Sequence, residues 1–195
     1  MPTRLPNKPD FESIEAAAID SADHRTMILA LIGNLVFSWS NNESMFIYVL
    51  MILLETDEVS AAIVFATLNT TRARLELVQR LAKAKIKDRE AAKMLERLID
   101  RFNDCTRVRN EFNHCMYTVS ERGEITHTHA MKIRESGGRL VLGEIRAMDQ
   151  ARIKELIKTV NNLKKLNREL WEFLPRLQAS IGSVRPIPTE EASTS

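Results

Sequence analysis

The sequence is poor in glycine, proline and cysteine, and it has no long hydrophobic run. Its 195 residues include 6 Gly, 6 Pro and 2 Cys, and aromatic residues make up 6% of the chain. With so few helix breakers, the middle of the chain is free to form helices. The longest apolar runs, 27–39 and 45–54, are separated by "SNNES", and each is shorter than the roughly 20 apolar residues that span a bilayer. We therefore expect no membrane-spanning segment.

The cysteines and the N-terminus indicate where the protein works. Cys105 and Cys115 would lie about 15 Å apart on one helix, which is beyond the reach of a disulfide. Unpaired cysteines suit a reducing compartment. The first ten residues, "MPTRLPNKPD", contain no apolar core and do not predict a signal peptide. These features predict a cytoplasmic protein.

Charge is distributed unevenly along the chain. Residues 1–60 contain 3 basic and 9 acidic residues, whereas residues 72–109 contain 12 basic and 6 acidic residues. A basic face can recruit phosphate groups. The alternative is a solvated helix face that pairs with the acidic first segment.

The hydrophobic spacing predicts a mostly α-helical protein, an up-and-down bundle with one β-hairpin inserted before the last long helix. The hairpin is expected at about 124–146, where "RESGG" supplies the turn. We expect a flexible arm over 1–20, a single domain over 21–176 and a disordered tail over 177–195. Helices are predicted over 23–55, 56–68, 69–86, 87–119 and 149–174.

The stretch "RVRNEFNHCMY", residues 107–117, ends the fourth predicted helix. Asn110 and His114 are four residues apart and share a helix face. Arg109 and His114 are five apart, about 140° around the helix, so they do not converge within one straight helix. Two copies of the helix that cross at a two-fold axis would bring them into one cleft.

These residue types suit the cleavage of an RNA phosphodiester. A neutral imidazole can accept a proton from a ribose 2′-hydroxyl. A guanidinium can bind the phosphate and stabilise the charge that builds on it. The alternative is structural, because Arg, Asn and His also suit a helix C-terminus.

The segment "RNEFNH", Arg109 to His114, resembles the R-x4-6-H signature of the HEPN superfamily (higher eukaryotes and prokaryotes nucleotide-binding). The likeness covers residues 23–120, with the motif toward the end of a long helix. It implies a HEPN-like helical bundle, a homodimer through the motif helix, and a metal-independent ribonuclease without a cofactor. It also implies RNA as substrate and an antitoxin or nucleotidyltransferase as partner, in toxin–antitoxin or phage-defence systems.

The resemblance implies Arg109 and His114 as the catalytic pair, with Asn110 in support. Asn113, Glu43 and Tyr117 are further supporting candidates. Glu43 could orient the motif through a charged hydrogen bond, or it could pair with a basic residue elsewhere. One toxin subgroup carries a tyrosine two positions after the histidine, whereas here Tyr117 comes three positions after it, so that subgroup is not assigned.

Two other sets of residues have competing interpretations. His127 and His129 alternate on a predicted strand and could supply two metal ligands, cover the cleft, or form an ordinary half-buried hairpin face. Aromatic residues on apolar faces are expected in the core rather than as base-stacking platforms: Phe37, Trp39, Phe46 and Phe65. Three functions follow, namely a ribonuclease, a non-catalytic dimer that binds RNA or nucleotides, and a metal enzyme.

Overall fold

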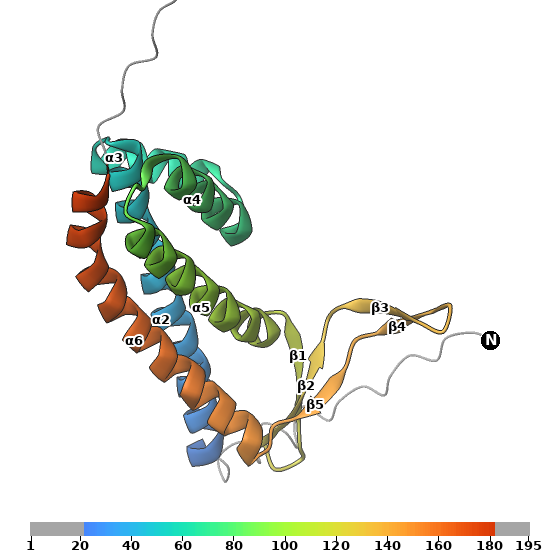
Figure 1. Ribbon diagram of the computed structural model, residues 1–195. Coiled ribbons are helices and arrows are strands. Elements are labelled where there is room, and N and C mark those ends of the chain that lie inside the picture. The colour runs from blue at the N-terminus through green and yellow to red at the C-terminus, as the bar shows by residue number, and fades with distance from the viewer. Residues whose placement is uncertain (1–21, 182–195) are drawn as a thin grey trace, which may run out of the picture. The chain divides into compact units, whose positions relative to one another are not determined.

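The structure, a computed structural model, describes residues 22–181. It is mostly helical, as predicted, with five helices and a small antiparallel sheet in this range (Figure 1). None of these helices has a stretch long and apolar enough to cross a membrane. The helices are α2 (Ala22–Leu54), α3 (Glu58–Thr67), α4 (Thr71–Lys85), α5 (Arg89–Asn113) and α6 (Gln150–Ser180).

The described chain divides into two compact units. The first contains 22–41 and 102–165, and the second contains 42–101 and 166–181, so α2, α5 and α6 contribute to both. The predicted arm over 1–20 and most of the predicted tail lie outside the described residues. The single domain over 21–176 remains a prediction.

Side chains cap the starts of the shorter helices. Asp57 precedes α3 and caps it, since its Oδ1 accepts from the Ser60 N–H at 2.9 Å. The hydrogen bonds from Ser60 hold the pKa of Asp57 below its usual value. Thr70 caps α4 through the Ala73 N–H at 3.1 Å. Each cap satisfies a donor that the helix itself leaves open.

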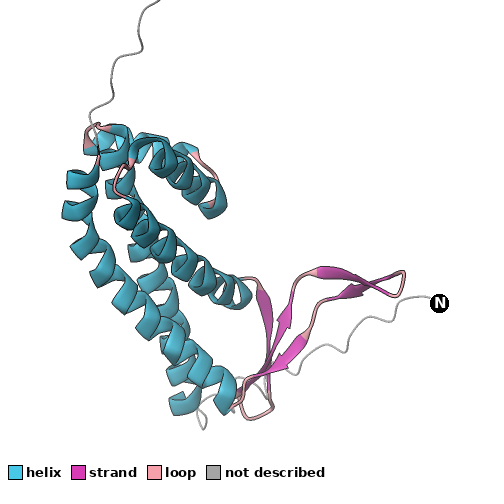
Figure 2. Ribbon diagram, viewed as in Figure 1, coloured by secondary structure: helices cyan, strands magenta, loops and turns pink. Residues whose placement is uncertain are grey.

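The single hairpin predicted at about 124–146 is wrong in detail, because four short strands occupy this region and a fifth precedes it (Figure 2). Three form a sheet in the order β1-β2-β5, with antiparallel pairing. Two more form a ribbon around Gly137 and Gly138, whose φ values of 57° and 73° suit glycine. The strands are β1 (Cys115–Val119), β2 (Ile125–Ala130), β3 (Ile133–Ser136), β4 (Arg139–Leu142) and β5 (Ile145–Ala147).

The first strand also corrects the predicted extent of the motif helix. α5 ends at Asn113, whereas the prediction continued it to Val119. Residues 115–119 instead alternate between half-buried and exposed side chains, which is the two-residue period of a strand. β-Branched and aromatic residues in "YTV" favour that conformation. The predicted motif, residues 109–114, therefore lies at the junction between the end of α5 and the start of β1.

The last helix begins as predicted but extends further. Asp149 accepts from the Arg152 N–H at 2.8 Å and so caps α6. The helix continues past Pro175 to Ser180, although proline removes one helical hydrogen bond. Leu177 is fully buried, and the Lys87 N–H donates to the Ser180 carbonyl at 3.3 Å. These tertiary contacts hold the last turn, so the tail does not begin at 177.

Most of the predicted aromatic core is present. Phe46 is fully buried, and Trp39 and Phe65 are 4% and 7% exposed. Phe37 is the exception, because its side chain is 66% exposed. Met27 and Leu29 of the same helix are also exposed, so α2 carries more apolar residues than its buried side contains.

Candidate functional site

A polar pocket of about 480 Å³ lies in the first unit, at the C-terminal end of α5. We name it the sheet-side pocket. Its walls come from α5, the strands β1, β2 and β5, and the first turn of α6. The lining residues are Asn103, Thr106, Arg107, Asn110, Glu111, His114, Cys115, Thr128, Ala130, Lys132, Glu144, Arg146 and Arg152.

Asn110 and His114, two of the three residues of the predicted motif, line this pocket. His114 follows the last residue of α5, and its N–H donates to the Asn110 carbonyl at 3.1 Å, which continues the helical turn. The His114 carbonyl accepts from the Met131 N–H at 3.2 Å, so the backbone of His114 is tied to the strand region. The His114 side chain is exposed. Its imidazole is therefore held at the pocket but accessible to a ligand.

Arg109 does not line the pocket. Its guanidinium carbon lies 3.8 Å from the centroid of the Trp39 ring, and its Nη1 donates to the Asn110 Oδ1 at 2.9 Å. Trp39 also stacks on Phe102 and donates from its Nε1 to the Thr106 Oγ1 at 2.8 Å. A cation over an indole face is attracted by the ring quadrupole. Arg109 thus connects the Trp39 cluster to Asn110, which does line the pocket.

Glu111 neutralises two of the arginines in the pocket. Its Oε2 accepts from Arg146 and from Arg152, each at 2.8 Å. Arg152 also pairs with Glu155, and its guanidinium lies 4.3 Å above the Phe112 ring. The Arg152 side chain is only 4% exposed, and these contacts satisfy its two terminal nitrogens, whereas its buried Nε has no hydrogen-bond partner among the described residues. This network fastens α6 and β5 to the end of α5.

The remaining candidates near the motif have different positions. Asn113 is exposed and is not among the lining residues. The Tyr117 hydroxyl donates to the Phe112 carbonyl at 2.7 Å, which ties β1 to the end of α5, and burial raises the pKa of Tyr117. Cys115 lines the pocket as a free thiol, and burial raises its pKa as well. A raised pKa leaves less thiolate, so nothing here indicates a nucleophilic cysteine.

Glu43 belongs to the second unit and is bound there. Its Oε1 accepts from the Thr71 hydroxyl at 2.6 Å and forms an ion pair with Arg74 at 3.0 Å. The Nε of Arg74 also donates to the Phe65 and Leu68 carbonyls. Glu43 therefore joins α2 to α4 through a basic residue, which was the alternative left open by the sequence.

Replacing Glu43 by alanine is expected to lower the free energy of unfolding by about 1–3 kcal/mol, because a charged hydrogen-bond partner of the half-buried Arg74 is lost. Urea denaturation measures this change. Glu76→Ala is the control, since its ion pair with Arg80 is mostly exposed and should contribute little. Equal stability of the two variants would contradict the structural role of Glu43.

His127 and His129 lie on the side of β2 opposite to its pocket-lining residues. Thr128 and Ala130 line the pocket, and side chains alternate along a strand. His127 is exposed, and the His129 Nε2 is 3.1 Å from the Gly143 carbonyl oxygen. Within residues 22–181, no three His, Cys, Asp or Glu side chains are grouped as metal ligands would be. His127 and His129 thus lie outside the sheet-side pocket.

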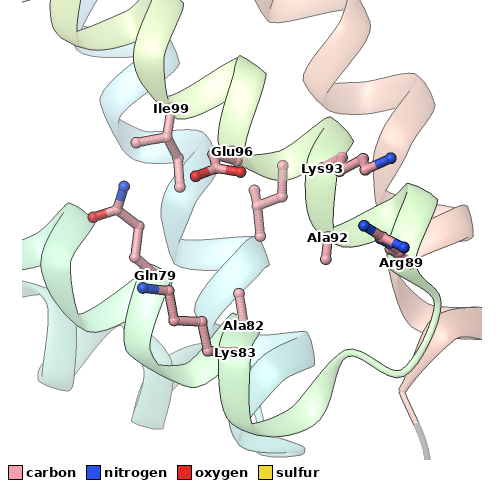
Figure 3. A pocket seen from close by; sticks show the side chains of 9 residues that line it. Gln79, Ala82, Lys83, Arg89, Ala92, Lys93, Glu96 and Ile99 are labelled. Carbon is pink, nitrogen blue, oxygen red and sulfur yellow. The ribbon is translucent and has the colours of Figure 1, made fainter.

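A second hollow, of about 230 Å³, lies between α4 and α5 in the second unit (Figure 3). Its floor is apolar, and Gln79, Lys83, Arg89, Lys93 and Glu96 bring polar groups to it. Its lining contains no histidine, cysteine or hydroxyl group, so it lacks an imidazole that could exchange a proton near neutral pH. The sheet-side pocket is therefore the better candidate for a site.

The sequence interpretation missed several residues of the sheet-side pocket. Arg107 could have been found, because it lies seven residues before His114 and thus on the same helix face. Lys132, Arg146 and Arg152 could not, since they reach the pocket through strand pairing and helix packing.

No protein-family model matches the sequence, and neither a curated protein nor a solved structure matches it.

Proposed function

We propose that this chain is a cytoplasmic, metal-independent endoribonuclease with a HEPN-like helical bundle, and that the sheet-side pocket is its active site. The observation that carries the proposal is the position of His114. Its exposed imidazole lines a pocket together with Asn110 and several cations, at the point where the sequence motif predicted a site. An accessible imidazole beside cations suits proton transfer at a phosphate.

In the proposed reaction the neutral His114 imidazole accepts the proton of a ribose 2′-hydroxyl. The 2′-oxygen forms a bond to phosphorus while the bond from phosphorus to the 5′-oxygen breaks. The leaving 5′-oxygen takes a proton from water or from an imidazolium. The products are a 2′,3′-cyclic phosphate and a 5′-hydroxyl, and nearby cations stabilise the charge on the phosphate oxygens.

The proposal includes a homodimer through the end of α5, with a composite cleft at its two-fold axis. An isologous interface would place two copies of the motif close together. An antitoxin or nucleotidyltransferase partner belongs to the same proposal. Sedimentation equilibrium tests the assembly: a monomer at micromolar concentration that still cleaves RNA would remove the dimer from the proposal but not the pocket.

Detection of the proposed products tests the activity. The purified protein is incubated with a long RNA of mixed sequence in the presence of EDTA, and the 3′ ends of the fragments are analysed. We expect 2′,3′-cyclic phosphates. Intact RNA, or fragments with only 3′-hydroxyl ends, would contradict the proposal.

A second candidate function is a non-catalytic module that pairs with a second copy of the chain. It is favoured by an exposed row across the sheet, in which Met116 and Ile145 lie on either side of His129 and are 54% and 62% exposed. Ile145→Lys would then break the dimer, whereas Ile63→Lys, at an equally exposed position on α3, would not. Unchanged sedimentation of both variants would exclude this interface.

A further inference from the structure

Three polar residues of α5 and His114, which follows its last residue, form a stripe that faces the sheet-side pocket. Asn103, Arg107, Asn110 and His114 follow one another at steps of four, three and four, and all four line the pocket. At about 100° per residue, the seven steps from Arg107 to His114 complete nearly two turns, so both side chains leave the same face about 10 Å apart along the axis. Arg109 leaves a different face, toward Trp39. The arginine that shares the pocket with His114 is therefore Arg107.

The cations of the pocket fall into two groups. Arg146 and Arg152 are paired with Glu111. Arg107 and Lys132 have no carboxylate or other hydrogen-bond partner for their side chains within residues 22–181. An anion can bind to these two side chains without displacing an existing partner. The pocket thus presents two available cations and one accessible imidazole.

The other lining residues indicate what kind of anion fits. None of the lining side chains that the structure describes is Phe, Tyr or Trp, and the only aromatic ring among them is the His114 imidazole, which the proposed reaction uses. Arg, Lys, Asn and Thr side chains make most of their hydrogen bonds to nucleic acid with phosphate and sugar. A volume of about 480 Å³ suits a nucleotide with its phosphates and not a duplex. The features together favour the backbone of single-stranded RNA.

We propose that Arg107 and Lys132 are the phosphate-binding residues of the sheet-side pocket, that the pocket binds the backbone of single-stranded RNA without preference for a base, and that Arg109 is a positioning residue which holds Asn110. This inference rests on the proposed function for the identity of its ligand. It departs from the sequence prediction, in which Arg109 itself was the phosphate clamp.

The test is the binding of a fluorescent 2′-O-methyl RNA decamer, which cannot be cleaved because the 2′-oxygen carries no proton. Arg107→Gln and Lys132→Gln are each expected to weaken binding about 5- to 20-fold and to reduce the slope of log K against log salt by about 0.7. Arg97→Gln, an exposed arginine of α5 outside the pocket, is the control and should match the wild type. Decamers of uridine and of adenosine should bind within about threefold of each other.

Arg109→Gln tests the positioning role. It should leave the affinity and the salt slope for the decamer unchanged but lower kcat for cleavable RNA, and Arg109→Lys should restore part of kcat because lysine retains the cation over Trp39. If instead Arg109→Gln lowers the salt slope while Arg107→Gln and Lys132→Gln bind like the wild type, the assignment is wrong. A wild-type protein that does not bind the decamer would also overturn it.

RNA binding and RNA cleavage are measured in separate experiments. A failure of this inference can therefore be told apart from a failure of the proposed function. Loss of affinity in Arg107→Gln and Lys132→Gln, in a protein that leaves RNA uncut, would support the phosphate-binding residues and contradict the ribonuclease. Cleavage of RNA by a protein whose affinity for the decamer is unchanged by both substitutions would support the ribonuclease and contradict the phosphate-binding residues.

Discussion

Replacing His114 by alanine is expected to lower the rate of RNA cleavage by about 10²- to 10⁴-fold, the usual contribution of a general acid–base group. The imidazole is exposed at the pocket, and only the backbone of His114 makes hydrogen bonds with the rest of the described chain. Its removal should therefore change the chemistry with little effect on folding. Single-turnover cleavage of an end-labelled RNA measures the loss.

His127→Ala is the matched control for this substitution. His127 is also an exposed histidine of the first unit, but it lies on the side of β2 opposite to the pocket-lining residues. Its replacement should leave the cleavage rate unchanged. An equal loss in both variants, or no loss in His114→Ala, would remove His114 from the reaction.

Replacing Trp39 by alanine is expected to lower the free energy of unfolding by about 3–5 kcal/mol, the usual cost of deleting a large buried aromatic side chain. Trp39 is 4% exposed, stacks on Phe102 and donates to Thr106. The substitution also removes the ring that supports Arg109. Urea denaturation followed by circular dichroism measures the change.

Two further variants make this prediction specific. Phe37→Ala, at an exposed position of the same helix, should stay within about 0.5 kcal/mol of the wild type. Trp39→Phe keeps most of the apolar volume but loses the hydrogen bond to Thr106, so its cost should be closer to 1 kcal/mol. If Trp39→Ala were as stable as Phe37→Ala, the contacts of Trp39 with Phe102 and Thr106 would not form a packed core.

The helices were predictable because their signals are local. The end of α2 near Glu55 follows from apolar spacing, and the start of α6 after Asp149 follows from a capping residue. The strands were predicted only in outline, because pairing joins segments that are apart in sequence. In β1, a helical pattern runs directly into a strand, and no proline or glycine marks the junction at His114.

The site, like the fold, was predictable where its signal is local, and not where it depends on tertiary packing. His114 and Asn110 share a helix face whatever the rest of the fold does, so their spacing alone placed them together. The choice between Arg107 and Arg109 depends on Trp39, which approaches α5 only through tertiary packing. Sequence resemblance favoured the arginine next to Asn110. The folded chain places that arginine on the indole ring and the other in the pocket.

The imidazole NMR spectrum of the protein, recorded during titration with a 2′-O-methyl RNA dinucleotide, tests directly whether RNA binds beside His114. The chain has 4 histidines, so each signal can be assigned by a single substitution. We expect the His114 signal to shift as the sheet-side pocket fills, while the His127 signal stays in place. A stationary His114 signal at saturating dinucleotide, or an equal shift of both signals, would contradict this expectation.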